Sequence, residues 1–369
     1  MLDKILKYIP IYTVFYAFKY FIVLLQLPTS FAKLIFTKPE IIKIKEYSNE
    51  HKFIFIYASI EPTISQSSSN VLNVIKELGG YIVLITNSSK YTLTDKSKSL
   101  VDVFINNKDR GWDFSQYKIA SNYIYKNLAN ENYTKVIYQN DSVFYLSNNL
   151  NHQLAKLLDI EYDFISFFDG SGANRYHLCS WSLSVSKNIF LDKKIKRFWG
   201  KFFEVKNKFY TIMQGELAFS KAVLSLFPKS QVIYNNHFLN LSKELNLSNT
   251  KYMSTLLMED FYDSINFMYG LDNKNTDPLK DYIFHNTTKY SFIQTFGLLL
   301  LKFHDMPFIK KDLFWLEHQS LSSFHLLEAI LVDKVDKDYV NTIKAYFLNR
   351  GHLSGSTPHR KILTFLGIR

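Results

Sequence analysis

The sequence predicts an α/β fold built on a doubly wound, mainly parallel sheet. Apolar strands alternate with helical segments through the first half of the chain, beginning with a strand at 52–59, a helix at 70–78 and a strand at 81–86. The helix ends at Gly79-Gly80, a strong breaker. Such alternation with helical crossovers is typical of parallel sheets. With 369 residues and 47% hydrophobic content, the chain is long enough to bury a sizeable core.

The alternation continues beyond these elements and then gives way to helices. Further strands are expected at 101–106, 134–139, 163–168 and 181–186, and further helices at 114–129 and 150–158. After about residue 210 the apolar periodicity is helical, at 215–227, 291–303, 321–332 and 339–348. The polar stretch Asn273 to Pro278 is the best linker. We therefore expect a helical amino-terminal segment (1–48), an α/β domain (49–272) and a carboxyl-terminal helical region (273–369).

Polar residues follow the strand at 134–139, where Asn140, Asp141 and Ser142 stand together. In an open α/β sheet, ligands bind at the carboxyl ends of the strands, so Asp141 is expected to face that site. An oxygen-rich set there suits Mg²⁺ or Mn²⁺ carrying a diphosphate, with Asp141 as the metal ligand. The alternative is a helix N-cap, which these three residue types also favour.

A second polar cluster follows the strand at 101–106. Gly111 permits a tight or positive-φ turn close to a ligand. Arg110 offers a planar fork for a phosphate or carboxylate, or is a solvated surface residue. Asp113 either caps the next helix or hydrogen-bonds a ribose or sugar.

Charge and composition narrow the classes of partner. The net charge of +11 indicates an anionic partner, which is a nucleic acid, an anionic lipid or a nucleotide-activated substrate. The 17% aromatic content suits sugar stacking or contact with a membrane. Because Cys179 is the only cysteine, an internal disulfide is excluded, as are zinc sites built from cysteines. No Walker loop or GxGxxG motif is present, which excludes those two phosphate-binding loops.

The amino terminus is apolar and aromatic from Ile9 to Leu27. Lys19 in its middle and the lack of a small-residue cleavage site argue against a removed signal peptide. The length just spans a bilayer, but a charge at the helix centre costs about 2.5 to 3.5 kcal/mol. Flanking lysines fit an interfacial helix on an anionic cytoplasmic leaflet, and so a peripheral protein at the cytoplasmic face of the inner membrane. The alternative is a core helix that packs on the domain.

A series of short motifs resembles one known family. The motifs are, with their residues, Gly111-Trp112-Asp113-Phe114, Asn140-Asp141-Ser142, His177-Leu178-Cys179-Ser180-Trp181, Phe198-Trp199, Gly215-Glu216 and Pro307-Phe308-Ile309-Lys310. On these residues the chain resembles the rhamnan synthesis protein F family of bacterial polysaccharide glycosyltransferases, from about Lys52 to Phe314. Departures from the family pattern are Asp109 in place of Asn, Cys179 in place of Gln, and Asn286-Thr287-Thr288-Lys289 in place of Asn-Pro-Thr-His.

The resemblance implies a GT-A-like enzyme that uses a nucleotide sugar. It would move rhamnose or another hexose from a nucleoside diphosphate sugar to a lipid-linked or growing cell-surface polysaccharide, such as a capsule, an O-antigen or a rhamnan. Its partners would be that donor, the lipid-linked glycan acceptor and the anionic inner leaflet. Tyr57, Ala58 and Ser59, at the end of the first strand, would contact the base and ribose.

Transfer also needs a base for the acceptor hydroxyl, and Asp169 and Glu216 are the candidates. Each is otherwise a cap or a favourable charge at a helix start. His177 would bind the donor phosphate or the metal, unless it is a packing residue. Lys310 and Lys311 either bind the pyrophosphate of a lipid carrier or face water.

Two other classes of function stay open. A nucleic-acid-binding protein fits the charge, but the basic residues are spread along the chain rather than clustered, so we expect no nucleic-acid partner. A catalytically inactive, membrane-associated scaffold of a polysaccharide assembly complex would keep the same fold.

Overall fold

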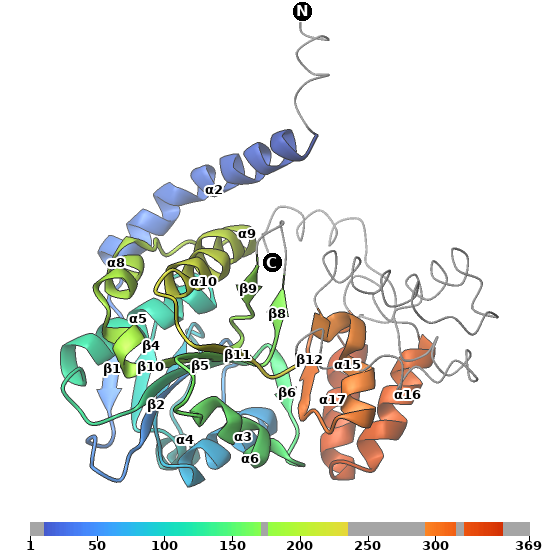
Figure 1. The fold of residues 1–369 in the computed structure, drawn as a ribbon. Helices are drawn as coiled ribbons and strands as arrows, with labels where there is room; N and C mark the ends of the chain where they lie inside the picture. The colour runs from blue at the N-terminus through green and yellow to red at the C-terminus, as the bar shows by residue number, and fades with distance from the viewer. Residues whose placement is uncertain (1–10, 171–175, 235–291, 315–320, 350–369) are drawn as a thin grey trace, which may run out of the picture.

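The computed structural model describes residues 11–170, 176–234, 292–314 and 321–349 (Figure 1). The strands are β1 (Glu40–Lys43), β2 (Phe53–Ser59), β3 (Gly80–Thr86), β4 (Val103–Asn106), β5 (Lys135–Asn140), β6 (Val143–Tyr145), β7 (Phe164–Ser166), β8 (Asp169–Gly170), β9 (His177–Leu178), β10 (Ser182–Ser186), β11 (Ser230–Val232) and β12 (Phe308–Lys310). The α-helices are α2 (Ile11–Phe36), α3 (Gln66–Glu77), α4 (Asp95–Leu100), α5 (Asp113–Asn127), α6 (Leu150–Ala155), α7 (Lys187–Leu191), α8 (Lys193–Lys201), α9 (Lys208–Tyr210), α10 (Leu217–Leu224), α15 (Phe292–Phe303), α16 (Leu321–Val332) and α17 (Lys337–Asn349). The described residues also include the 3₁₀ turn η1 (Lys156–Leu158) and the π-helical turn η3 (Thr211–Glu216).

The central sheet has eight strands in the order β1-β4-β3-β2-β5-β10-β7-β11. Strands β2, β3, β4 and β5 are mutually parallel, which confirms the predicted α/β class with a mainly parallel sheet. Strands β1 and β10 run antiparallel to their neighbours. The chain between β7 and β10 includes β8 and β9, which pair antiparallel, and its described residues contain no crossover helix of the kind that joins parallel strands.

The sheet changes winding direction at β2. From β2 the chain adds β3 and then β4 on one side, and afterwards β5 on the other side of β2. The carboxyl ends of β2 and β5 therefore flank the topological switch point, where open α/β sheets bind their ligands. Ser59 ends β2 and Asn140 ends β5, and the Asp141 amide donates to the carbonyl oxygen of Ala58 at 3.1 Å.

Alternation along β2 builds a core on each face of the sheet. Phe53, Phe55 and Tyr57 pack into one apolar cluster, and Ile54, Ile56 and Ala58 pack into the other. All of these side chains are buried, as expected for a strand covered on both faces. Helices α3 and α6 lie on the first face, and α5, α8 and α10 lie on the second (Figure 1).

The carboxyl-terminal elements join the first of these clusters. Strand β12 pairs antiparallel with β6, and Phe308 lies opposite Tyr145. Buried side chains of α15, α16 and α17 belong to the same cluster as the side chains of α3. The pairing brings the residues after β12 next to the residues after β5. The linker predicted at Asn273 to Pro278, and with it the boundary between residues 272 and 273, lies outside the described residues.

Helix α2 extends from Ile11 to Phe36, beyond the predicted end at Leu27. One side packs on the domain, where Val23 is 4% exposed and forms a small cluster with Val205 and Phe209. The Lys19 ammonium lies over the Phe209 ring, 5.3 Å from its centre. The large apolar side chains of α2 that stay exposed are Phe18, Phe21, Leu24, Leu25, Phe31, Ile35 and Phe36.

In Figure 1, α2 runs along the outside of the domain past α8 and α9. By length and composition it is the one helix among the described residues that is able to cross a membrane. Among the described side chains of α2 only Val23 is buried, so the helix contacts the domain along a narrow strip and leaves most of its apolar side chains exposed.

The end of α2 is tied to the loop that follows β4. The Lys33 ammonium lies 2.8 Å from one oxygen of Asp109, and the Lys206 ammonium lies 2.7 Å from the other. The neighbouring Arg110 donates to the carbonyl oxygen of Thr37 at 3.1 Å. This loop continues directly into α5 and the residues at the switch point.

Candidate active site

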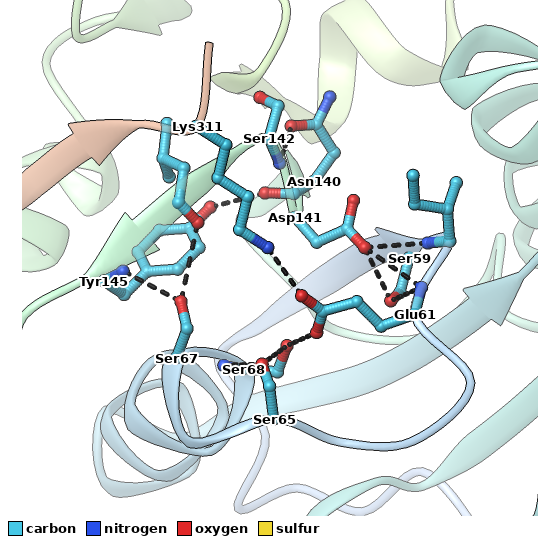
Figure 2. A network of polar contacts seen from close by, with 12 residues as sticks. Ser59, Glu61, Ser65, Ser67, Ser68, Asn140, Asp141, Ser142, Tyr145 and Lys311 are labelled. Atoms are coloured by element: carbon cyan, nitrogen blue, oxygen red, sulfur yellow. Dashed lines mark hydrogen bonds and ion pairs between the residues drawn. The ribbon is translucent and has the colours of Figure 1, made fainter. Parts of the chain in front are cut away.

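Asp141 lies at the centre of a polar network at the switch point (Figure 2). Its Oδ2 accepts from the Ser59 hydroxyl at 2.9 Å, from the Ile60 amide at 2.8 Å and from the Glu61 amide at 3.3 Å. The residue is 8% exposed. The helix-cap interpretation of Asn140, Asp141 and Ser142 is wrong, because strand β6 rather than a helix follows them.

Asn140 joins the two polar clusters that the sequence identified. Its side-chain amide donates to Oδ2 of Asp113 at 3.0 Å, and its side-chain oxygen accepts from the Ser142 amide at 3.1 Å. The N-cap position of α5 is Trp112, which makes no side-chain cap bond, and Asp113 is the first helical residue. The Asp113 carboxylate therefore contacts Asn140 and does not take the cap position expected as one alternative.

Glu61, two residues beyond β2, is a member of the network that the sequence did not reveal. Its Oε1 lies 2.6 Å from the Lys311 ammonium, and its Oε2 accepts from the Ser68 hydroxyl at 3.3 Å. Ser68 lies in the first turn of α3, where the Ser65 hydroxyl caps the helix. An acidic residue just past a strand end was a usable signal, but the lysine that binds it comes from the other end of the chain.

Lys310 and Lys311 carry positive charge into the same network. The Lys310 ammonium donates to the Ser142 hydroxyl at 2.9 Å and lies 6.0 Å from the centre of a Trp181 ring. Lys311 is 8% exposed and approaches the Phe144 ring. The expectation that these lysines face water is wrong for Lys311, because the pairing of β12 with β6 turns it inward.

The environment of Asp141 changes its acidity. Burial raises the pKa of this carboxyl above its ordinary value, the Lys311 ammonium opposes that rise, and the nearby Glu61 carboxylate adds to it. Additional positive charge at Asp141 would thus stabilise its ionised form.

The Asp141 network has the donor atoms that a hard cation needs. Oδ1 of Asp141 makes no hydrogen bond with any residue that the structure describes, whereas Oδ2 has three donors. The neighbouring side chains of Ser59, Glu61 and Ser142 offer only oxygen atoms. Mg²⁺ and Mn²⁺ prefer such ligands, so the residues present fit the predicted divalent metal.

Tyr57, Ala58 and Ser59 lie as predicted at the end of a strand, and of their side chains only that of Ser59 contacts Asp141, whereas that of Tyr57 reaches Glu61 through Ser68. Tyr57 and Ala58 are 1% exposed and belong to the two cores. The Tyr57 hydroxyl hydrogen-bonds Ser68 at 3.0 Å, and the Ala58 carbonyl accepts from Asp141.

Arg110 and Gly111 hold the loop that leads to Asp113. The Arg110 Nε lies 2.8 Å from Oε2 of Glu204, in a largely buried ion pair. Gly111 has a φ of +100°, as predicted, and a Cβ at this position would collide with the Ser115 side chain. These contacts orient the loop. A phosphate would have to displace Glu204 in order to bind the Arg110 guanidinium.

Asp169, His177 and Glu216 form a second group beside the first. Asp169 begins β8, which pairs with β9, and His177 begins β9. Burial and the nearby Asp169 carboxylate raise the pKa of Tyr176 to about 12, so that this hydroxyl stays protonated beside Asp169. Residues 171–175, which connect β8 to Tyr176, lie outside the described residues.

Glu216 ends the π-helical turn η3 and is also the N-cap position of α10, as the helix-start alternative predicted, and its Oε1 accepts from the Ser180 amide at 2.7 Å. The segment after Ser180 reaches the first network directly, because the Trp181 carbonyl accepts from the Asn140 amide at 3.2 Å. The two base candidates thus belong to a group that adjoins Asp141.

Comparisons with known proteins give little further information about the function of this chain. No protein-family model and no curated protein matches the chain. Among solved structures, S. aureus TarS 1-349 aligns at 12% identity over 85% of this chain and 89% of its own, with a TM-score of 0.33. The mannosyltransferase PcManGT from Pyrobaculum calidifontis, in complex with GDP-Man and Mn²⁺, aligns at 10% identity over 96% of this chain and 94% of its own, also at 0.33. Similarity this low leaves the function to be inferred from this chain's own residues.

Proposed function

We propose that this protein is a nucleotide-sugar-dependent glycosyltransferase of the GT-A-like kind. It would transfer a hexose, with rhamnose expected from the family resemblance, from a nucleoside diphosphate sugar to a lipid-linked or growing cell-surface polysaccharide. The observation that supports this proposal most is the position of Asp141 at the switch point, within a network of carboxylates and ammonium groups.

The leaving group in such a transfer is a nucleoside diphosphate, on which negative charge develops. In the proposal Asp141 holds a divalent cation, with Ser142 and Asn140 supporting it, and that cation neutralises diphosphate charge when bound. The Lys310 ammonium, already directed at Ser142, would add charge stabilisation beside it. Lys311 balances Glu61 and keeps two nearby carboxylates compatible in one site.

The nucleoside would lie along the carboxyl end of β2 and the amino end of α5. Ser59, Asp113 and Asn140 are assigned to the ribose and the diphosphate, and the backbone of Tyr57 and Ala58 borders the same place. Arg110 and Gly111 position the loop that carries Asp113. His177 would approach the donor phosphate from the neighbouring group.

An inverting transfer needs a carboxylate to accept the proton of the acceptor hydroxyl. Asp169 and Glu216 remain the two candidates, since both belong to the group that adjoins Asp141 through Trp181 and Asn140.

We further propose that α2 rests on the anionic inner leaflet and brings the site to a lipid-linked acceptor. Exchanging Phe21 and Leu25 for Glu would place charge on the exposed apolar side of α2 and should weaken binding to vesicles that contain an anionic phospholipid, by about tenfold or more per substitution. Flotation with full-length protein measures this. Ile160, an exposed residue of the α/β domain, provides the matched control, and I160E should bind as the unchanged protein does. Equal vesicle binding by F21E, L25E and I160E would contradict the proposal.

The function itself is tested by thermal shift with nucleoside diphosphates and their sugars, with and without Mn²⁺. A donor that binds only the native state raises the free energy of unfolding by about 2.7 kcal/mol at a hundred times its Kd. We expect one nucleoside diphosphate to stabilise the protein, and more so with Mn²⁺. Stabilisation by RNA or DNA alone would favour the nucleic-acid-binding alternative, and nucleotide binding without transfer or hydrolysis would favour the inactive scaffold.

A further inference from the structure

Three side chains with metal-binding atoms converge beside the Asp141 network. The ligand atoms of His177, Cys179 and Glu216 all lie within 4.8 Å of one another. His177 is buried, and Cys179 and Glu216 are partly buried. His177 and Cys179 come from β9 and the residue that follows it, and Glu216 comes from η3.

The β9 segment presents His177 and Cys179 together. In extended chain, side chains two residues apart point to the same side. The residue between them, Leu178, points into the core and is 1% exposed. The Leu178 amide donates to the Ser220 hydroxyl at 3.0 Å, and the Cys179 amide donates to the Phe168 carbonyl at 2.9 Å. The backbone that carries the imidazole and the thiol is thus fixed on both sides.

Glu216 is positioned by an unusual backbone. The π-helical conformation is rare and occurs often at functional sites. Here it ends at Glu216, and the preceding Gly215 packs so closely on Phe114 that a Cβ would lie 2.6 Å from the ring. The Ser180 amide donates to Oε1 of Glu216, which holds the carboxylate and leaves Oε2 for another contact. Hydrogen bonds of this kind orient the ligands of metal sites.

We propose that His177, Cys179 and Glu216 form a zinc site, separate from the oxygen-only site at Asp141. Zn²⁺ binds imidazole nitrogen, thiolate and carboxylate together, and three protein ligands leave a fourth position for water or a substrate oxygen. Mg²⁺ and Mn²⁺ avoid sulfur, so the two sites select different ions. The single cysteine excludes zinc sites that need several cysteines, but this mixed site needs only one.

The zinc site does not depend on the proposed transferase activity, and a His177 that ligates Zn²⁺ would not also bind the donor phosphate directly. It does bear on the choice of base, because a carboxylate that ligates Zn²⁺ is not available to accept a proton from an acceptor. Occupancy of this site would leave Asp169 as the base of the proposed transfer.

The test is a titration of the full-length protein with Co²⁺, a spectroscopic substitute for Zn²⁺. A thiolate bound to Co²⁺ gives an intense charge-transfer absorption, and because Cys179 is the only cysteine, any such band reports this residue. We expect the band to saturate at one equivalent and to disappear when Zn²⁺ is added. In C179S the band should be absent. In H177A and E216Q the affinity should fall by about a hundredfold.

Two control variants separate this site from the rest of the protein. The exposed His152 is the matched histidine, and H152A should bind Co²⁺ like the unchanged protein. D141N should keep the band even if it loses transfer, so that the two proposals fail independently. Circular dichroism confirms that each variant is folded. The proposed zinc site is wrong if the folded protein gives no charge-transfer band, or if H177A and E216Q bind Co²⁺ as tightly as H152A does. It is also wrong if the band saturates at half an equivalent of Co²⁺, because each ion would then be shared by two chains.

Discussion

Replacing Asp141 with Asn is expected to lower the rate of sugar transfer by about a thousandfold while the protein stays folded. The Asn side-chain oxygen can still accept from Ser59, Ile60 and Glu61, so the local backbone is preserved. What is lost is the negative charge that would hold the divalent cation. Transfer from the nucleotide sugar identified by thermal shift measures the effect. D159N is the control, because Asp159 is an exposed carboxylate that accepts an amide hydrogen bond at 2.9 Å.

The same variant gives a stability prediction with a defined sign. Since the folded-state pKa of Asp141 is raised, its ionised form destabilises the fold at pH values above the ordinary carboxyl range. D141N should therefore be at least as stable as the unchanged protein at neutral pH, and the advantage should disappear as the pH falls and the Asp141 carboxyl of the unchanged protein becomes protonated. Urea denaturation across this range checks the sign. A folded D141N with normal transfer would remove Asp141 from the site.

Replacing Lys311 with Met is expected to lower the free energy of unfolding by about 2 kcal/mol. Breaking a fully buried ion pair from one side costs about 3 to 5 kcal/mol, and Glu61 retains some exposure, which reduces the loss. Without the ammonium, the Glu61 and Asp141 carboxylates repel each other, and the pKa of Asp141 should rise further. Urea denaturation measures the stability, and donor affinity should fall with it.

The double variant K311M/E61Q separates charge balance from packing. If the loss in K311M comes from the uncompensated Glu61 carboxylate, adding E61Q should recover most of the stability. Lys344, paired with Glu328 on α16 at 2.5 Å and more exposed, is the matched control, and K344M should cost less than about 1 kcal/mol. Equal losses in K311M and K344M would contradict the role assigned to Lys311.

The parallel part of the sheet was predictable because its strands are covered on both faces. Strand β2 is buried along its whole length, and a continuous apolar run is a strong signal. Strand β1 was missed because it is short and exposed, and its two apolar residues, Ile41 and Ile42, are adjacent, so that they give neither alternation nor a long apolar run. The reversed direction of β10 was missed because strand direction depends on the connection, which single-strand patterns do not report.

The positions of the candidate site residues were predictable where they follow from local sequence. Asp141 was placed at a strand end because it stands directly after an apolar run, and Gly111 was placed in a turn because a positive φ favours glycine. The ion pairs were not predictable. Arg110 is paired with Glu204 and Glu61 with Lys311, and both pairings depend on how distant segments fold against each other. The sequence around a charged residue does not indicate which distant residue will form an ion pair with it.

The seating of α2 has a practical consequence for anyone who shortens this chain to improve its solubility. Removing the helix would uncover Val205 and Phe209, take away one of the two lysines that bind Asp109, and remove the Lys33 carbonyl that holds Thr37, the backbone acceptor of Arg110. Helix α2 thus also covers part of the α/β domain, and a more soluble variant should carry polar substitutions on its exposed side while its packed side is left unchanged.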